Sequence, residues 1–364
     1  MIEFDYETLS SLGLTPALAA RAAALPVPDG VAGRLLRITH VHRESVGLHD
    51  GRKEQVARPL PRLVRSLAAD NSALAVGDWV VAVADAHGQA WVHERVPPSS
   101  HIGRRDGDGR RHPVVSNVDT ALLVMGLDDD FNPRRLERFL ALVQGVDVLP
   151  VVVLTKADVA TPTDEALEAR LDALRGRIPG HVDVVAVNAT HASAASALQS
   201  YLTRGQTLVL LGSSGAGKST LTNTLLGADV QDTGGVRDSD GRGKHTTTAR
   251  SLHRLPGGAC VIDTPGLRTL RPDGDEATLA VSFADIDALA AQCRFRDCRH
   301  VHEPGCAVRD GVDADRLRNY HKLLREMRRD TLTALDRQRQ VAEWKVRGRI
   351  AKERMRAKRG ESGT

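Results

Sequence analysis

The sequence of 364 residues lacks any apolar run long enough to cross a membrane. A membrane-spanning helix needs about 18 or more consecutive apolar residues. The first residues, 1–5, are acidic and lack the basic and apolar regions of a secretion signal. These absences predict a protein of the cytoplasm that has no membrane partner.

Cysteine is also scarce, with four residues in the whole chain. So few cysteines in a chain of this length exclude a disulfide framework. One of them, Cys260, lies in an apolar run and is interpreted as a buried small hydrophobic residue. The other three lie close together in the sequence, which is typical of a metal site.

The excess of positive charge is small, only +4 at pH 7, but it is unevenly distributed. Residues 315–364 contain 16 Lys and Arg against 7 Asp and Glu, a net charge of +9, so the rest of the chain carries −5. A basic arm on a mildly acidic body indicates a polyanionic partner such as RNA. A solvated basic helix explains the same composition equally well.

The patterns along the chain predict several domains, as the length allows. Residues 1–30 are interpreted as an N-terminal extension with a short helix. Short β-type runs in residues 31–98 predict a five-stranded OB-fold barrel that binds RNA. Its Trp79 and Trp91 are either core residues or platforms for stacked bases. The polar, glycine-rich segment 99–113 is interpreted as a linker.

Strands alternate with helices in residues 114–282, which predicts a parallel α/β sheet covered on both faces. Buried strands are expected at 118–125, 148–154, 182–187, 207–211 and 259–262. Residues 283–335 contain the clustered cysteines and are expected to form a zinc-binding, mainly α-helical domain. Residues 336–364 are interpreted as a basic helical tail.

A phosphate-binding loop is predicted between a strand and a helix, the context that the pattern G-x-x-x-x-G-K-[ST] requires. Its residues are Gly212, Ser213, Ser214, Gly215, Ala216, Gly217, Lys218, Ser219 and Thr220. In such a loop the backbone N–H groups surround phosphate oxygens. Lys218 is expected to reach the β- and γ-phosphates, and the hydroxyl of Ser219 to bind Mg²⁺.

Two further motifs fit the same nucleotide. Asp263 follows a predicted strand and can hold Mg²⁺ through water, and the N–H of Gly266 can bind the γ-phosphate. In a glycine-rich segment between this motif and the loop, Thr246 or Thr247 is expected to complete the Mg²⁺ shell, with Thr247 assigned as the ligand.

The residue after Gly266 is Leu267, where Ras-like enzymes have the glutamine that orients water. An aliphatic side chain cannot orient water, so we expect slow intrinsic hydrolysis. His245 is the candidate catalytic residue for that task. The alternative is an exposed loop histidine without this role.

Guanine recognition is predicted from Thr155-Lys-Ala-Asp158, which ends another strand. The carboxylate of Asp158 can accept hydrogen bonds from N1–H and the 2-amino group of guanine, which adenine does not offer in the same way. Lys156 is expected to lie along the base, and Thr155 replaces the more usual Asn. Asn188 and Ala189 are expected to add a contact after the next strand. In most GTPases this motif follows the phosphate loop, whereas here it precedes the loop.

A zinc site is predicted from Cys293, Cys298, His300 and Cys306, which offer three thiolates and one imidazole within fourteen residues. This is the ligand set of a closed structural site. His302 is the alternative fourth ligand.

Five features are shared with one known family: the permuted motif order, the barrel, Gly-Lys-His-Thr-Thr-Thr at 243–248, Asp-Thr-Pro-Gly-Leu at 263–267 and the cysteine pattern. In these features the chain resembles the ribosome small-subunit-dependent GTPase A (RsgA/YjeQ) family over residues 31–324. The resemblance implies an OB-fold, a circularly permuted P-loop GTPase domain and a zinc domain, with GTP or GDP, Mg²⁺ and one zinc ion as ligands. It also implies GTP hydrolysis stimulated by the 30S subunit during late maturation of that subunit, with 16S rRNA as a partner. The family associates the histidine matching His245 with catalysis, and we expect a monomer.

Two other functions fit parts of the sequence. An RNA-binding module with a nearly inert nucleotide site is supported by Leu267. An ATP-dependent P-loop enzyme is disfavoured by the guanine motif.

Overall fold

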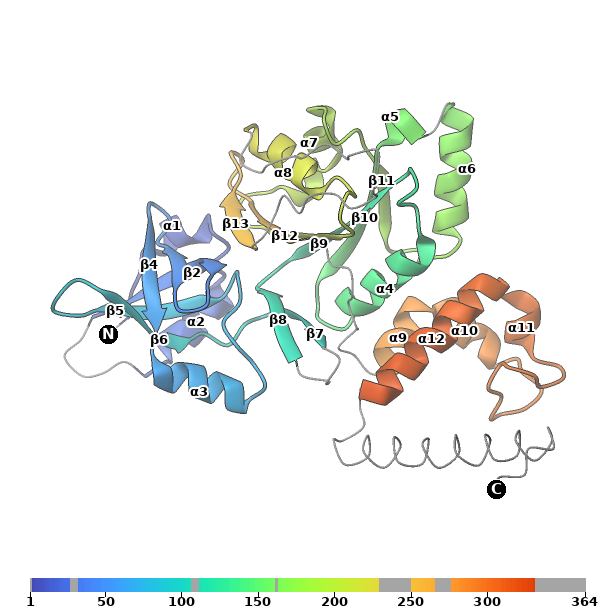
Figure 1. Cartoon of the computed structure of the whole chain (residues 1–364), viewed down its shortest axis with the longest axis horizontal. Helices are drawn as coiled ribbons and strands as arrows, with labels where there is room; N and C mark the ends of the chain where they lie inside the picture. Colours follow the sequence, from blue (N-terminus) through green and yellow to red (C-terminus); the bar gives the residue numbers. More distant parts are fainter. Residues whose placement is uncertain are drawn as a thin grey trace, which may run out of the picture.

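The computed structural model describes residues 2–26, 32–105, 111–160, 163–228, 250–265 and 276–330. Three parts follow one another along the chain: a β-barrel, an α/β sheet and a group of C-terminal helices (Figure 1). In this described part of the chain, no helix is both long and apolar enough to cross a membrane.

The predicted barrel is confirmed. It consists of β2 (Gly33–Val41), β3 (Val46–His49), β4 (Glu54–Pro59), β5 (Trp79–Ala84) and β6 (Ala90–Arg95). The strands pair in the order β2-β3-β4-β6-β5, and pairing of β5 with β2 closes the barrel. Alternate apolar residues such as Leu36 and Ile38 fill its interior, where Leu63 and Leu67 of α3 (Pro61–Ala69) also pack.

The central domain is a parallel sheet, as the alternating pattern predicts. Its strands, in spatial order, are β11 (Asp183–Ala186), β10 (Leu149–Thr155), β9 (Thr120–Gly126), β12 (Thr207–Gly212) and β14 (Cys260–Asp263). An antiparallel strand, β13 (Ser251–Arg254), extends the sheet and pairs with β2 of the barrel, so the two sheets are continuous.

Helices cover both faces of this sheet. One face carries α4 (Pro133–Val143) and α6 (Asp164–Arg175), and the other carries α7 (Ser193–Ala197), the short η1 (Gln199–Tyr201) and α8 (Lys218–Leu226). Because successive strand residues point to opposite faces, Leu123 and Met125 of β9 enter one core and Leu122 and Val124 the other. The short α5 (Ala157–Ala160) follows β10.

Two segments are more ordered than their composition indicates. The N-terminal residues form β1 (Ile2–Glu3), α1 (Tyr6–Ser10) and α2 (Pro16–Ala23). Residues 99–113, interpreted as a linker, instead contain most of the antiparallel hairpin of β7 (His101–Arg105) and β8 (Arg111–Ser116). Both segments enter the core of the central sheet, through Leu9 and Leu18 and through Ile102 and Val114. Trp79 is buried in this same core, which assigns it the structural role.

The C-terminal helices form a core of their own. They are α9 (Glu276–Ser282), α10 (Ala284–Ala290), α11 (Ala307–Gly311) and α12 (Ala314–Asp330). Leu279 of α9 packs with Phe283 and Met327, so this core begins before residue 283, and Ala141 of α4 belongs to it. The basic tail 336–364 lies outside the described residues.

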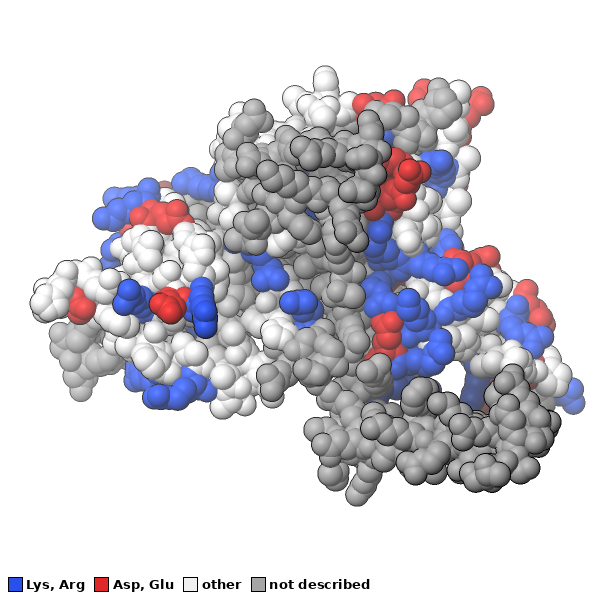
Figure 2. Space-filling view, viewed as in Figure 1, with Lys and Arg blue, Asp and Glu red and all other residues white. Residues whose placement is uncertain are grey.

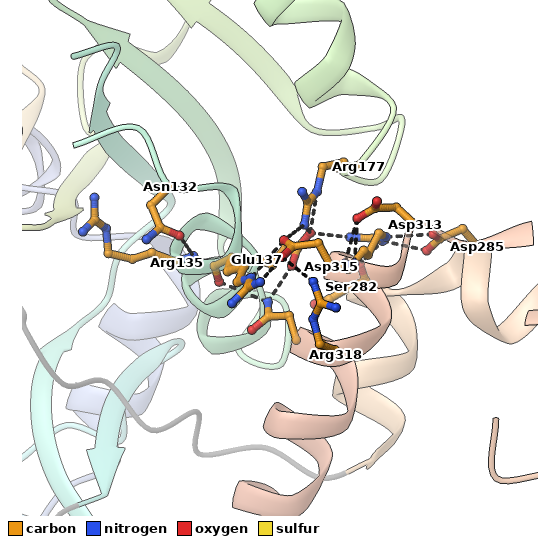
Figure 3. A network of polar contacts seen from close by, with 12 residues as sticks. Asn132, Arg135, Glu137, Arg177, Ser282, Asp285, Asp313, Asp315 and Arg318 are labelled. Atoms are coloured by element: carbon orange, nitrogen blue, oxygen red, sulfur yellow. Dashed lines mark hydrogen bonds and ion pairs between the residues drawn. The ribbon is translucent and has the colours of Figure 1, made fainter. Parts of the chain in front are cut away.

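A buried polar network joins α4 to these helices (Figure 3). Glu137 of α4 is 1% exposed and accepts hydrogen bonds from Arg316 at 2.9 Å and Asn319 at 2.5 Å, both on α12, and from Arg177 at 3.1 Å. Arg316 also donates to Asp285 of α10 at 2.6 Å. A buried carboxylate with several charged and polar donors tolerates little displacement, because losing a partner leaves an uncompensated charge. The network therefore holds the C-terminal helices against the central domain.

Arg37 of β2 joins the barrel to the rest of the molecule. Its guanidinium is fully buried and donates to the carbonyl of Gly77 at 3.3 Å, the carbonyl of Asn117 at 2.9 Å and Oγ1 of Thr207 at 2.9 Å. It also donates to the carbonyl of Leu12. These acceptors belong to the barrel, the end of the hairpin, the central sheet and the N-terminal segment.

We expect the Arg37→Met variant to lose about 3–5 kcal/mol of unfolding free energy, because buried acceptors in four segments lose their donor. The control is Arg34→Met on the same strand, whose side chain is 48% exposed and paired with Asp50. That change should cost at most about 1 kcal/mol. Denaturant unfolding of both variants measures the difference, and equal losses would contradict the role of Arg37.

Candidate functional site

The segments that follow β9, β10, β12 and β14 meet at the carboxyl edge of the parallel sheet. Ligands of open α/β sheets bind outside this edge. The phosphate-loop pattern, the guanine motif and the Asp263 motif are far apart in the sequence, but each follows one of these strands. The sheet therefore brings the three motifs to one place.

The phosphate loop connects β12 to α8 with the backbone geometry its glycines allow. Gly215 and Gly217 have φ values of +83° and +89°, a left-handed conformation that favours glycine. A Cβ on Gly212 would lie 2.3 Å from the carbonyl oxygen of Val124, which also requires glycine. No side chain caps the N-terminus of α8, so its first N–H groups can bind an anion.

Lys218 lies inside this loop. It is 5% exposed, and its Nζ donates to the carbonyl oxygen of Ser213 at 2.6 Å. Burial lowers the pKa of Lys218, whereas the carboxylates of Asp263 and Asp130 act to raise it. The ammonium is thus enclosed by the loop that is expected to receive phosphate.

Ser219 and Asp263 lie beside Lys218, as a magnesium site requires. The hydroxyl of Ser219 is 3.4 Å from the carboxylate of Asp263. A hydroxyl and a carboxylate are oxygen ligands of the kind that Mg²⁺ prefers, so these residues fit that ion. Thr220 follows in α8, and Ser214 lies at the tip of the loop. The other residues expected here, namely His245, Thr246, Thr247 and Gly266, lie outside the described residues.

The guanine motif is hydrogen-bonded to the phosphate loop. Thr155 is buried, and its hydroxyl donates to the carbonyl oxygen of Ala216 at 2.7 Å. The residue that replaces the more usual Asn therefore ties the two motifs together. Lys156 has a φ of +60°, and its Nζ donates to the carboxylate of Asp128 at 2.6 Å. Burial alone would raise the pKa of Asp128, but the hydrogen bond from Lys156 lowers it.

Asp158 is exposed and is held by Asn188, whose side-chain amide donates to its Oδ2 at 2.9 Å. The amide oxygen of Asn188 accepts from the backbone N–H and the hydroxyl of Thr190, at 2.9 and 2.6 Å. The carbonyl of Ala189 accepts from the hydroxyl of Thr224 in α8 at 2.6 Å. Asp158 is thus linked through Asn188 to a segment that is hydrogen-bonded to α8.

Sequence reasoning missed two carboxylates at this edge. Asp128 holds Lys156, and both carboxylate oxygens of Asp130 lie 2.7 Å from the hydroxyl of Ser213 in the phosphate loop. Arg135, in the first turn of α4, donates to Asp130 at 2.5 Å. The available signal was the run Asp128-Asp-Asp130 directly after a strand that neighbours the phosphate-loop strand.

The four expected zinc ligands lie together, with their ligand atoms within 4.8 Å of one another. Sγ of Cys293 is 3.9 Å from Sγ of Cys306, and Nδ1 of His300 is 3.6 and 3.4 Å from these two sulfurs. Tetrahedral zinc would separate two sulfurs by about 3.8 Å and a sulfur from a nitrogen by about 3.5 Å. The set of Cys293, Cys298, His300 and Cys306 therefore fits zinc, and the alternative ligand His302 is exposed and outside this group.

The chain around this cluster is folded tightly. His300 has a φ of +59°, and the carboxylate of Glu303 accepts from the backbone N–H groups of Val301, His302 and Arg299. The hydrogen bond from Val301 has the largest effect among these, and together they lower the pKa of Glu303 to about 2. The segment 299–303 is therefore held in its tight turn by hydrogen bonds between its own backbone and the carboxylate of Glu303.

Comparison with known proteins gives consistent matches. Residues 96–272 match the family described as RsgA GTPase. The chain is 44% identical over 342 residues to the small ribosomal subunit biogenesis GTPase RsgA of Xanthomonas axonopodis pv. citri, covering 89% of each chain. It is 43% identical over 338 residues to the protein of that name from Xanthomonas oryzae pv. oryzae, covering 88% of each.

Two solved structures have a similar fold. YjeQ from Thermotoga maritima matches with a TM-score of 0.57 and 23% identity, over 81% of this chain and 98% of that one. YloQ, a circularly permuted GTPase, matches with a TM-score of 0.55 and 22% identity, over 85% of this chain and 100% of that one. At these identities the likeness concerns the fold alone.

We expect the purified protein to contain one zinc ion per chain. The Cys306→Ser variant should lose this ion, and its C-terminal helices should then exchange amide hydrogens faster, because the thiolate also lies in their core. Cys260→Ser is the matched control, because this buried cysteine lies in the central sheet. Metal analysis with hydrogen exchange measures both, and full zinc content in the Cys306 variant would contradict the site.

Proposed function

This chain belongs to the RsgA GTPase family, and on that premise we propose that it hydrolyses GTP to GDP and phosphate in the biogenesis of the small ribosomal subunit. The observation that carries the proposal is the hydrogen bond between Thr155 and Ala216, together with that between Thr224 and Ala189. These bonds join the segments 155–158 and 188–189 to the loop 212–220 and its helix, which supports the proposal that they bind one nucleotide although their order in the chain is permuted.

The phosphates are proposed to lie in the loop 212–220, with Lys218 and the first N–H groups of α8 as donors. Ser219 and Thr247 are the proposed ligands of Mg²⁺, with Asp263 acting through water, and the bound ion would offset charge on the phosphates. The N–H of Gly266 is proposed to contact the γ-phosphate.

Asp158 is the proposed acceptor for N1–H and the 2-amino group of guanine. The amide of Asn188 holds one oxygen of this carboxylate and so limits its rotation. Lys156 is proposed to lie along the base. Its ammonium is held by Asp128, which is therefore a positioning residue.

We propose His245 as the catalytic residue that orients the attacking water, because Leu267 cannot do so. Contact with the 30S subunit is proposed to bring this histidine into place, so that hydrolysis becomes fast only on the particle. Such a gating step requires that the subunit bind the conformation with His245 in place better than the conformation without it.

The proposed RNA partner is 16S rRNA, which the protein would meet in the cytoplasm as a monomer. Lys and Arg gather on one face over α4 and α12 (Figure 2). On these helices Arg134 and Arg318 pair with Asp315, and Arg138 pairs with Glu326, which offsets part of the positive charge. The basic residues of 336–364 add further positive charge. Such surfaces bind the phosphate backbone in a salt-dependent manner.

The decisive test is multiple-turnover phosphate release from GTP with purified 30S, 50S or 70S particles. We expect the 30S subunit to raise the rate at least about 10-fold, since a supplied orienting group contributes about 10²–10⁴-fold in general acid–base catalysis. An unchanged rate with 30S subunits would support a binding module with an inert nucleotide site instead.

For base recognition, we expect Asp158→Asn to raise the Kd for GDP about 100-fold, because an amide N–H then faces the donors of guanine. The variant should gain affinity for XDP, since xanthine carries an oxygen where guanine has its 2-amino group. The control is Asp164→Asn, an exposed carboxylate in the first turn of α6. Calorimetric titration measures each Kd, and an unchanged preference for GDP over XDP would remove Asp158 from the site.

A further inference from the structure

Asp130 contacts the phosphate loop from the neighbouring strand end. Both of its carboxylate oxygens are 2.7 Å from the hydroxyl of Ser213, the second residue of the loop. The carbonyl oxygen of Ser213 in turn accepts from the ammonium of Lys218 at 2.6 Å. The side chain of Asp130 is 15% exposed. A largely buried carboxylate therefore contacts the same loop residue as the lysine that is proposed to bind phosphate.

The carboxylate of Asp130 is fixed in this position. The backbone N–H of Gly126 donates to its Oδ2 at 3.3 Å, and Arg135 of α4 donates to its Oδ1 at 2.5 Å and also to its carbonyl oxygen. Arg170 of α6 donates to the carbonyl oxygen of Leu127 at 2.6 Å. Because these bonds hold both the carboxylate and the backbone that carries it, Asp130 cannot turn away from the loop without losing several hydrogen bonds.

The ammonium of Lys218 depends on negative charge in its surroundings. Burial lowers the pKa of Lys218, whereas the carboxylates of Asp263 and Asp130 raise it. A buried ammonium is costly unless negative charge lies nearby. The phosphates of a nucleotide supply that charge when the site is filled. When the site is empty, the two carboxylates supply it.

Asp130 differs from Asp263 in its role once a nucleotide is bound. Asp263 is proposed to hold Mg²⁺ through water, and the positive charge of that ion offsets its negative charge. Asp130 belongs to no such shell in the proposed site. Its cationic partner Arg135 has a side chain that is 30% exposed, so water weakens this pairing. Incoming phosphates therefore share Lys218 with the fixed negative charge of Asp130.

We propose that Asp130 is an internal counter-ion of Lys218 that weakens the binding of guanine nucleotides and speeds the release of GDP. The inference rests on the proposed function, which places nucleotide phosphates in this loop. The carboxylate stabilises the empty site by offsetting the charge of the ammonium, and it destabilises the filled site by repelling phosphate oxygens. Both effects favour exchange of the bound nucleotide.

The alternative is that Asp130 only holds the phosphate loop in shape through Ser213. The two roles predict opposite changes in affinity. Removing a group that only preorganises the loop weakens nucleotide binding, because the loop must then be ordered at the moment of binding. Removing the charge of a counter-ion strengthens nucleotide binding. The sign of the change in Kd therefore distinguishes the two roles.

The experiment compares Asp130→Asn with the wild-type protein and with two further variants. Asparagine has nearly the same size and keeps an oxygen that can accept from Ser213, but it carries no charge. Asp129→Asn is the matched control, because it removes an exposed carboxylate from the same segment. Ser213→Ala removes the hydroxyl and leaves the charge of Asp130 in place. Calorimetric titration measures the Kd for GDP and for a non-hydrolysable GTP analogue, and displacement of a fluorescent GDP measures the dissociation rate.

We expect Asp130→Asn to lower the Kd for both nucleotides about 10-fold, the effect of a unit charge roughly 10 Å away at an effective dielectric constant of about 20. Most of the change should lie in slower dissociation of GDP. Asp129→Asn should change each Kd less than about 2-fold, because salt and water screen an exposed charge. The unfolding midpoint of the nucleotide-free protein should fall in Asp130→Asn, and saturating GDP should raise the midpoint by more than in the wild-type protein.

Three results would overturn the proposal. A higher Kd in Asp130→Asn would assign the residue to shaping the loop, and an unchanged Kd would show that its charge does not act on Lys218. An equal gain of affinity in Ser213→Ala would attribute the effect to release of the loop instead of to the charge.

Failure of the proposed function gives a different result. If the wild-type protein binds neither GDP nor the GTP analogue, the proposed function is wrong, and the role of Asp130 with it. If the wild-type protein binds both and is stimulated by 30S subunits, but Asp130→Asn does not bind more tightly, only the role of Asp130 is wrong.

Discussion

The parallel direction of β9, β10, β12 and β14 is the constraint on which the candidate site depends. Parallel strands place all their carboxyl ends at one edge, so the segments after them meet whatever their order in the chain. Permuting the chain therefore leaves the site intact as long as each motif still follows its own strand. The hydrogen bond from Thr155 to Ala216 follows from this arrangement. It joins the end of β10 to the loop after β12, and these two strands are the neighbours of β9 in the sheet.

Around this sheet, two buried arginines hold the other domains in place. Arg37 links the barrel and the N-terminal segment to the start of β12, and Arg316 links the C-terminal helices to Glu137 of α4. A buried guanidinium is stable only when its donors are paired, so each of these two contacts permits one arrangement of the domains that it connects.

The contacts between domains also provide routes by which a conformational change at the candidate nucleotide site can reach the other domains. The Asp263 motif is separated from the C-terminal helices by a short segment of chain, so a displacement of the motif can be transmitted to these helices along the backbone. The structure adds a second connection, because Asp130 contacts the phosphate loop and precedes α4, whose Glu137 holds α12. On the other side, β13 is paired with both the central sheet and the barrel. The candidate nucleotide site is thus connected by packed elements both to the C-terminal helices and to the barrel.

By itself, the sequence determined the barrel, the parallel sheet, the strand–loop–helix geometry of residues 207–226 and the residues of the Cys₃His cluster. Their signals are local, since residue alternation and short motifs encode backbone geometry over a few positions. It did not predict the hairpin in 99–113, because Ile102 is the one aliphatic residue of this polar, glycine-rich segment and becomes part of a core only in the tertiary structure.

Only the tertiary structure decided the partners of the functional side chains. The sequence identifies Lys156, Asp158 and Asn188 as candidate residues, but not that Asp128 holds Lys156 or that Asn188 holds Asp158. The distance between segments on neighbouring strands is set by packing of the sheet and its helices. Spacing along the chain carries no information about that distance, so these pairs are defined by the fold.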